Sequence, residues 1–130
     1  MTSLITLEEI KAARDALPDV IRRTPILPLS RDSAEVGQEK LFLKAENLQV
    51  TGAYKVRAAF TMMNAIEPER LKNGLVLTSS GNFAQGFAYA GARRGVKVVV
   101  VMLDHTSPYK IQGTEGYGAE VFLCATDASA

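Results

Sequence analysis

Residues 75–124 alternate between short β-branched runs and longer stretches of helical spacing, and this alternation restricts the fold more than any other feature. The predicted strands are short and apolar and occupy residues 75–78, 96–103 and 118–124. Two helices are predicted between them, over residues 83–94 and 107–118. Because strands that alternate with helices form βαβ units, the sequence predicts an α/β fold with a doubly wound parallel sheet. The run from Val96 to Leu103 lacks polar alternation, which is typical of a parallel strand covered on both faces.

The N-terminal part of the chain is predicted to contain a helix followed by extended segments. Thr6-Leu7-Glu8-Glu9 has the pattern of a capping box, and Pro18 should end this helix at about Leu17. Residues 23–27 are predicted to be extended, either as a plain connector or with a direct role, and residues 41–46 to form a strand. A turn is predicted at Gly37, and the start of a further helix at residues 126–130.

A lysine lies near the start of the next predicted helix, which runs to about Ile66. Thr51 is predicted as its N-cap. The predicted apolar face consists of Tyr54, Ala58, Met62 and Ala65. Lys55 then lies where the helix dipole disfavours a cation, and burial acts in the same direction. Both effects favour the neutral amine, which reacts with aldehydes. Position alone does not assign this role, because most such lysines are solvated surface charges.

A second candidate site lies between the strand over 75–78 and the helix that follows it. Its sequence is Ser79-Ser80-Gly81-Asn82. In open α/β sheets ligands bind in this crevice, and the N–H groups at a helix start favour an anion such as a carboxylate. The alternative is a simple polar helix cap, which is the commoner role of such a string.

Composition argues against several classes of protein. Apolar residues make up 47% of the 130 residues, and the net charge is +1 without a basic stripe, so no nucleic-acid partner is expected. The longest apolar run, from Val98 to Leu103, is too short to span a bilayer, so a cytoplasmic protein without a membrane partner is expected. His105 is the single histidine and is predicted at the surface, so no metal site is expected. Cys124 is the single cysteine and is predicted in the core.

Two segments resemble one known family. Residues 44–57, Lys-Ala-Glu-Asn-Leu-Gln-Val-Thr-Gly-Ala-Tyr-Lys-Val-Arg, closely resemble the cofactor-lysine segment of the fold type II pyridoxal phosphate (PLP) enzymes, above all threonine dehydratases (threonine ammonia-lyases) and serine racemases. Ala53, Tyr54 and Ala58 stand where these enzymes usually have Ser, Phe and Gly. Residues 79–86 resemble the family's Ser-Ser/Ala-Gly-Asn-His-Ala-Gln-Gly loop, with Phe83 in place of His. The resemblance implies the tryptophan synthase β-like fold, and mostly its small domain.

The resemblance also implies roles for individual residues. Lys55 would hold PLP covalently and take the Cα proton of the substrate, and Tyr54 and Asn82 would contact the cofactor. The residues implied around the substrate carboxylate are Ser79, Ser80, Gly81, Asn82 and Phe83. Ser80 is also implied as a second acid or base on the face opposite the lysine, as in serine racemases, whereas many dehydratases have Ala there.

The implied activity is that of a threonine dehydratase, which converts L-threonine or L-serine to a 2-oxo acid and ammonia in amino-acid metabolism such as isoleucine biosynthesis. The whole enzyme is expected to be a homo-oligomer. Ser80 motivates the alternative of a serine racemase or serine dehydratase. A cysteine synthase-like enzyme is disfavoured, because that group has Gly-Ser-Val-Lys-Asp-Arg around its lysine.

The family's phosphate-binding run of glycines is not found in this sequence, and family members are considerably longer. An N-terminal fragment is therefore expected, with residues 1–50 belonging to the large domain and residues 51–130 to the small domain. Such a fragment is expected to have little or no activity alone. The same observation motivates the remaining alternative, a non-catalytic α/β module.

Overall fold

The structure of the chain, a computed structural model, describes residues 4–28 and 41–125. The elements in chain order are α1 (Leu7–Asp15), β1 (Ile26–Pro28), β2 (Phe42–Lys44), the short 3-10 helix η1 (Glu46–Leu48), α2 (Lys55–Asn64), α3 (Pro68–Leu71), β3 (Leu75–Thr78), α4 (Asn82–Arg94), β4 (Val98–Leu103), α5 (Pro108–Gly116) and β5 (Glu120–Cys124). The predicted turn at Gly37 and the predicted helix start at 126–130 lie outside the described residues.

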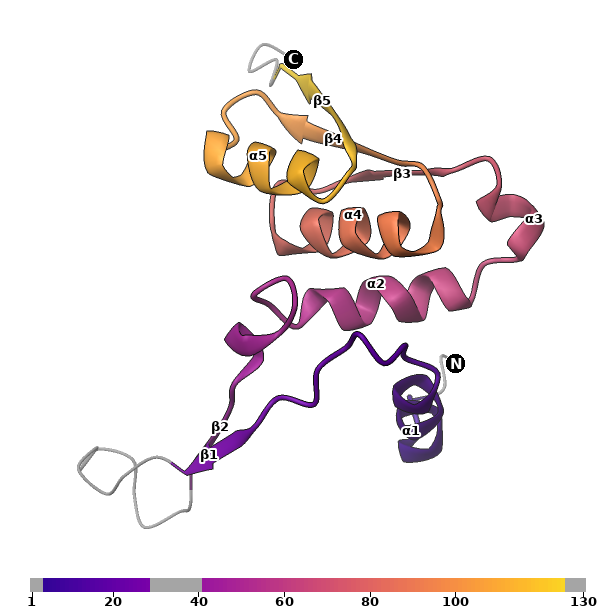
Figure 1. Cartoon of the computed structure of the whole chain (residues 1–130), viewed down its shortest axis with the longest axis vertical. Coiled ribbons are helices and arrows are strands. Elements are labelled where there is room, and N and C mark those ends of the chain that lie inside the picture. Colours follow the sequence, from indigo (N-terminus) through magenta and orange to yellow (C-terminus); the bar gives the residue numbers. More distant parts are fainter. Residues whose placement is uncertain (1–3, 29–40, 126–130) are drawn as a thin grey trace.

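Strands β3, β4 and β5 form a parallel sheet with β4 in the middle (Figure 1). Leu75 of β3 pairs with Val98 of β4, and Val99 pairs with Glu120 of β5. A separate antiparallel pair is formed by β1 and β2, with Leu27 opposite Leu43. The structure thus confirms the predicted α/β fold with a parallel sheet.

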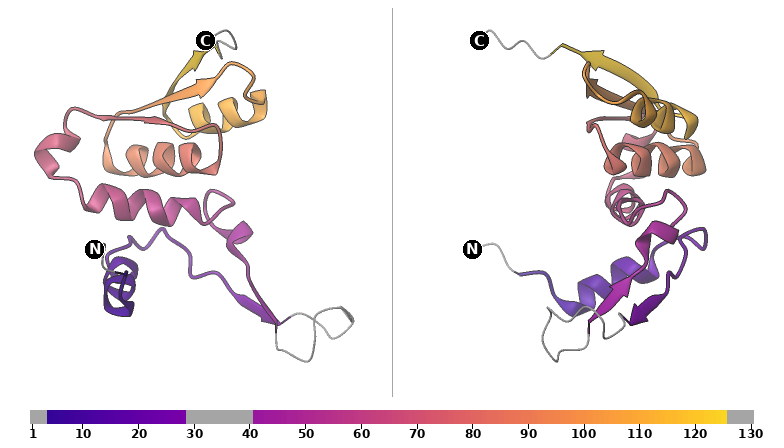
Figure 2. Two further views of the ribbon diagram at one scale, coloured as in Figure 1. Left: turned by 180° about the vertical axis from the view of Figure 1, so that it is seen from behind. Right: turned by 90° about the vertical axis from the view of Figure 1, so that its left-hand side faces the viewer.

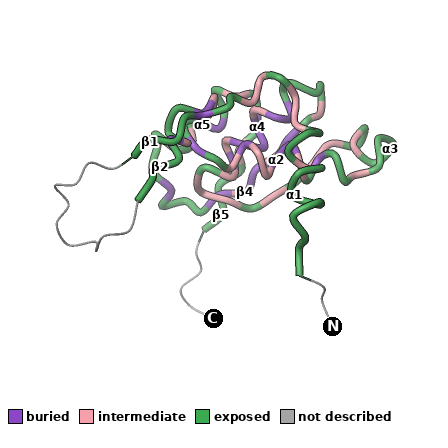
Figure 3. Tube along the Cα trace, turned by 90° about the horizontal axis from the view of Figure 1, so that it is seen from below, coloured by how far each residue is buried: buried purple, intermediate pink, exposed green. Residues whose placement is uncertain are grey.

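Helix α4 is the central layer of the molecule and lies between the sheet and α2 (Figures 1 and 2). Its buried residues are small apart from one aromatic ring: Ala84, Gly86, Phe87, Ala88, Ala90 and Gly91. A Cβ atom at Gly91 would lie 2.3 Å from a Val98 methyl group and 2.8 Å from the Val96 carbonyl oxygen, so the helix approaches the sheet closely. Buried segments gather accordingly on α2, α4 and β4 (Figure 3).

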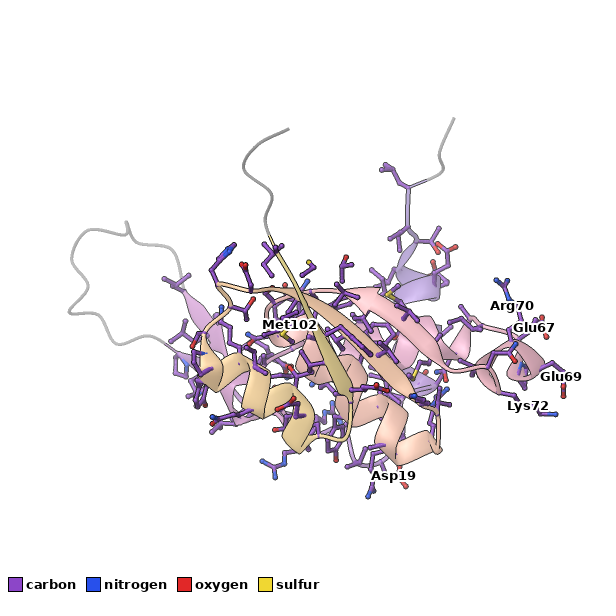
Figure 4. The ribbon with its side chains drawn as sticks, turned by 90° about the horizontal axis from the view of Figure 1, so that it is seen from above. Asp19, Glu67, Glu69, Arg70, Lys72 and Met102 are labelled. Carbon is purple, nitrogen blue, oxygen red and sulfur yellow. The ribbon has the colours of Figure 1, made fainter. Side chains whose placement is uncertain are left out.

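Both crossover helices lie on one face of the sheet (Figure 2). Because β3, β4 and β5 follow one another in one direction, right-handed connections place α4 and α5 on the same side. Met102, labelled in Figure 4, is buried on the covered face, whereas Val76 and Phe122 on the opposite face are 74% and 52% exposed. The expectation of a middle strand covered on both faces is therefore wrong for the described residues, since β4 is buried at alternate positions.

Helix α2 begins and packs differently from its prediction. It starts at Lys55 with Tyr54 as the N-cap, and the Thr51 hydroxyl instead donates to the Ala53 carbonyl oxygen over 3.4 Å. The buried face consists of Val56, Ala59, Phe60 and Met63. Of the predicted face, Tyr54 and Met62 are exposed. Both faces carry apolar residues at helical spacing, and packing against α4 decides which one is buried.

The local predictions outside α2 were more accurate. The capping box at α1 is confirmed, because the Glu9 amide donates to Thr6 Oγ1 over 3.2 Å and the Thr6 amide donates to Glu9 Oε2 over 2.7 Å. Gly95 ends α4 with a left-handed φ of 67°.

Cys124 is exposed on the edge strand β5, so its predicted core position is wrong. Within residues 4–28 and 41–125, no helix has the length and apolar character needed to cross a membrane.

Candidate active site

Lys55 is the first residue of α2, and its amine lies beside two aromatic rings. Its Nζ atom is 5.0 Å from the centroid of the Tyr54 ring and 5.7 Å from that of the Phe83 ring. The residue is half-buried, and among the described residues its side chain makes no ion pair or hydrogen bond. Because the amine lies beside aromatic rings and no carboxylate of the described residues pairs with it, it is available to a ligand.

The contact with Phe83 brings together the two segments that the sequence analysis selected. Strand β3 ends at Thr78 and α4 begins at Asn82, so residues 79–81 form the loop at the carboxyl end of the sheet. The first N–H groups of α4 have no partner within the helix, which makes this end favourable for an anion. A Cβ atom built on Gly81 would meet no atom within 4 Å, so the loop borders open space. The arrangement places an anion-binding backbone next to a free amine.

The other predicted site residues lie in this loop or at the start of α4. Ser79 and Ser80 are half-buried, and Ser79 Oγ accepts a hydrogen bond from the Gly81 amide over 3.4 Å. Asn82 is exposed, and within the described part of the chain its side-chain amide makes no hydrogen bond. That amide is therefore free to bind a ligand.

Gly86 sets how closely the two segments approach. A Cβ atom at Gly86 would lie 3.1 Å from the Lys55 carbonyl carbon, 3.1 Å from the Val56 amide nitrogen and 3.2 Å from the Lys55 carbonyl oxygen. These are backbone atoms, which cannot rotate away as a side chain does. No separate role was predicted for Gly86, although a glycine inside a predicted helix indicates such a packing position.

We expect the Gly86→Ala substitution to lower the free energy of unfolding by about 1–3 kcal/mol, because the added methyl group pushes α2 away from α4. Urea unfolding followed by circular dichroism measures this change. Gly116→Ala is the matched control, because a Cβ atom there would meet no atom within 4 Å and alanine is the better helix former. A Gly86→Ala protein as stable as the unchanged chain would contradict this description of the packing.

A network around Glu46 joins the chain before β1 to the start of α2. Arg57 Nε donates to Glu46 Oε2 over 2.9 Å, and Arg57 Nη2 donates to Glu46 Oε1 over 2.9 Å. The Thr24 hydroxyl also donates to Glu46, and Arg57 Nη2 donates to the Arg22 carbonyl oxygen over 2.8 Å. We call these four residues, Arg22, Thr24, Glu46 and Arg57, the Glu46 clamp. Thr24 is buried, and its carbonyl oxygen also accepts a hydrogen bond from Lys44 Nζ, which lies outside this clamp.

The clamp controls the charge of Glu46. The hydrogen bond from Arg57 lowers the pKa of this carboxyl group from 4.5 to about 2, with the Thr24 hydroxyl acting in the same direction and burial opposing it. Glu46 is therefore ionised at neutral pH. Because Arg57 lies two residues after Lys55 in the same helix, the ion pair holds the turn that presents the lysine.

A further contact reaches the loop from the neighbouring strand. The Thr106 hydroxyl donates to Ser80 Oγ over 2.9 Å. Thr106 follows β4, and neighbouring parallel strands end at the same edge of a sheet, which brings the two hydroxyls together. In this segment His105 was considered as a site residue and Thr106 was not predicted, although the place of Thr106 after the adjacent strand was a usable signal.

Metal-ligating side chains are not gathered at this site. His105 is exposed, as predicted, and its Nδ1 lies 3.4 Å from Asp104 Oδ1. Across the residues that the structure describes, no three His, Cys, Asp or Glu side chains are grouped to hold a metal ion.

Curated relatives match most of this chain. Over 120 residues the chain is 35% identical to the catabolic L-threonine dehydratase of Staphylococcus aureus (strain USA300). This match covers 92% of this chain and 35% of the relative. It is 40% identical to the L-threonine ammonia-lyase of Thermotoga maritima, covering 92% of this chain and 30% of the relative. The chain therefore spans about a third of the length of the curated relatives that it matches.

A solved structure and a family match also relate the chain to PLP-dependent enzymes. The crystal structure of serine racemase from Dictyostelium discoideum superposes with a TM-score of 0.84 at 36% identity, over 97% of this chain and 41% of the other. Residues 17–130 match the family described as pyridoxal-phosphate dependent enzymes. Since this match covers most of the sequence, the chain belongs to the pyridoxal-phosphate dependent enzyme family.

Proposed function

We propose that this chain carries the catalytic lysine of a PLP-dependent lyase that eliminates the β-hydroxyl group of L-threonine or L-serine and converts the substrate to a 2-oxo acid and ammonia. The observation that carries the proposal is the half-buried Lys55 amine, which has no ion-pair partner within residues 4–28 and 41–125 and lies beside the anion-binding end of α4. The threonine dehydratase and ammonia-lyase relatives support the substrate class. The proposal includes a homo-oligomer in the cytoplasm. Because the Staphylococcus aureus relative is named catabolic, it does not include isoleucine biosynthesis.

The residues present fit PLP by their chemistry. The cofactor is an aromatic aldehyde, and it requires a primary amine that is not engaged in an ion pair, as Lys55 provides. The rings of Tyr54 and Phe83 border the amine, and the free amide of Asn82 is available to bond the phenolic oxygen of the cofactor. When bound, PLP supplies the electron sink for the negative charge that develops at the substrate Cα.

The residues of the chain bind the substrate and move its protons. The Ser79 hydroxyl and the N–H groups at the start of α4 would hold the substrate carboxylate and thereby fix the orientation of the Cα–H bond. The Lys55 amine would take the Cα proton as a general base. Departure of the β-hydroxyl group and hydrolysis then yield a 2-oxo acid and ammonia. Lys55 thus both holds the cofactor and transfers the proton.

The proposal is tested by adding PLP to the purified chain, reducing with borohydride and mapping the modified peptide. Modification at Lys55 supports the proposal. The same treatment is applied to a chimera in which this chain replaces the matched 120 residues of the Thermotoga maritima L-threonine ammonia-lyase. Ammonia release from L-threonine by the chimera supports the lyase activity. A chimera that neither binds PLP nor releases ammonia would contradict the proposal and favour a non-catalytic module.

Racemisation of serine is a second candidate activity, and Ser80 is the observation that favours it. Its half-buried hydroxyl lies in the loop that adjoins Lys55 and is held by a hydrogen bond. A second acid or base on the face opposite Lys55 is what racemisation requires in addition to elimination.

We expect the Ser80→Ala substitution in the chimera to lower racemisation of L-serine by about 100-fold or more, while ammonia release stays within a few-fold of the original rate. Chiral chromatography of serine and an ammonia assay on the same sample measure both reactions. Survival of racemisation in the alanine variant would show that Ser80 is not the second acid or base.

A further inference from the structure

We propose that Thr106 is a positioning residue for Ser80, and that its hydroxyl group holds Ser80 in place for proton transfer at the substrate Cα. The inference rests on the role proposed above for Ser80. The hydrogen bond from Thr106 Oγ1 to Ser80 Oγ, 2.9 Å long, carries it. It joins residues 26 positions apart in the sequence, so each loop restrains the other.

Thr106 is suited to this task because its own position is fixed. The residue is 8% exposed, and its amide donates to the Leu103 carbonyl oxygen over 2.9 Å. It lies three residues after the end of β4 and directly precedes Ser107, the N-cap of α5, so it is placed between two regular elements. Its β-branched side chain has few rotamers, which limits the directions its hydroxyl group can take.

The hydrogen bond has a chemical consequence when the Thr106 hydroxyl is its donor. A serine oxygen that accepts from Thr106 keeps its own proton available for another acceptor. If Ser80 gives this proton to the Cα carbanion, a C–H bond forms and the serine oxygen becomes negatively charged. The Thr106 hydroxyl then donates to that oxygen and stabilises the charge. In the reverse step the charged oxygen takes the Cα proton. In both directions Thr106 would act through Ser80 and not on the substrate itself.

A first experiment needs neither PLP nor turnover. Unfolding equilibria are measured for the unchanged chain, Ser80→Ala, Thr106→Val and the double variant. Valine keeps the shape of the buried threonine but removes the hydroxyl group. We expect the effect of Ser80→Ala on the unfolding constant to differ about five-fold with and without the Thr106 hydroxyl. Additive effects would overturn the inference, since the hydrogen bond would then contribute nothing to holding Ser80.

A second experiment uses the chimera and tests function. We expect Thr106→Val to lower serine racemisation about ten-fold or more, with ammonia release and borohydride trapping on Lys55 unchanged. Thr106→Ser keeps the hydroxyl group and is expected to restore racemisation. An equal loss of both reactions, or no rescue by serine, would overturn the inference because Thr106 would then be merely structural.

The two proposals fail in different ways. A chimera that traps PLP on Lys55 and releases ammonia without racemising serine would overturn the roles of Ser80 and Thr106 but leave the lyase proposal standing. A chimera that traps no PLP would overturn the proposed function itself.

Discussion

Replacing Lys55 with alanine is expected to abolish trapping of PLP and to lower ammonia release by the chimera at least about a thousand-fold. The reason is that one amine holds the cofactor and transfers the Cα proton, so no second group replaces either role. Mass spectrometry of the borohydride-reduced protein and an ammonia assay measure the two losses. Lys55→Arg keeps a long polar side chain beside the Tyr54 and Phe83 rings but removes the nucleophilic amine, and we expect it to fail equally.

A lysine on another helix provides the matched control. Lys72 follows α3, pairs with Glu69 over 2.7 Å and lies at the periphery of the molecule (Figure 4). We expect Lys72→Ala to leave trapping and ammonia release unchanged. Trapping that persists in Lys55→Ala at the level of the Lys72→Ala protein would show that surface lysines capture the cofactor, and the assignment of Lys55 would be wrong.

The alternation of elements after residue 75 was predictable because it depends on local patterns. The predicted strand over 75–78 coincides with β3, and the glycine at position 95 ends α4 in the left-handed conformation. Which face of an element is buried depends on distant segments. On α2, the sets Tyr54–Ala58–Met62 and Val56–Phe60–Met63 both have helical spacing, and only the position of α4 selects the second.

In the candidate site, too, local features were predicted from the sequence and contacts between distant segments were not. Lys55 and the loop at residues 79–82 were selected from the sequence, because each matches a local pattern. Their supporting contacts were not predicted. Gly86 acts through the backbone of a different helix, and Thr106 reaches Ser80 across neighbouring strands. A glycine inside a helix and a hydroxyl residue after the adjacent strand are signals that such contacts exist, but they do not identify the residue that each one meets, and the structure was needed for that.

The largest expected effect on stability comes from the Glu46 clamp. We expect Glu46→Gln to lower the free energy of unfolding by about 2–3 kcal/mol at pH 7. Glutamine keeps the size of the side chain but removes the charge, and this leaves the Arg57 guanidinium, 28% exposed, without its anionic partner. The matched control is Glu69→Gln, because the Glu69–Lys72 pair is exposed and such pairs contribute about 0–1 kcal/mol.

The same pair predicts a dependence of stability on pH. The pKa of Glu46 is about 2 in the folded chain and 4.5 ordinarily, so its stabilising effect is complete above pH 4.5 and is lost as the pH falls toward 2. Urea midpoints at pH 6, 5, 4 and 3 are therefore expected to fall more steeply for the unchanged chain than for Glu46→Gln. Glu9 and Asp15 also have lowered pKa values, but both proteins contain them, so their contribution cancels in the difference. Parallel curves for the two proteins would show that the ion pair with Arg57 does not stabilise the turn that presents Lys55.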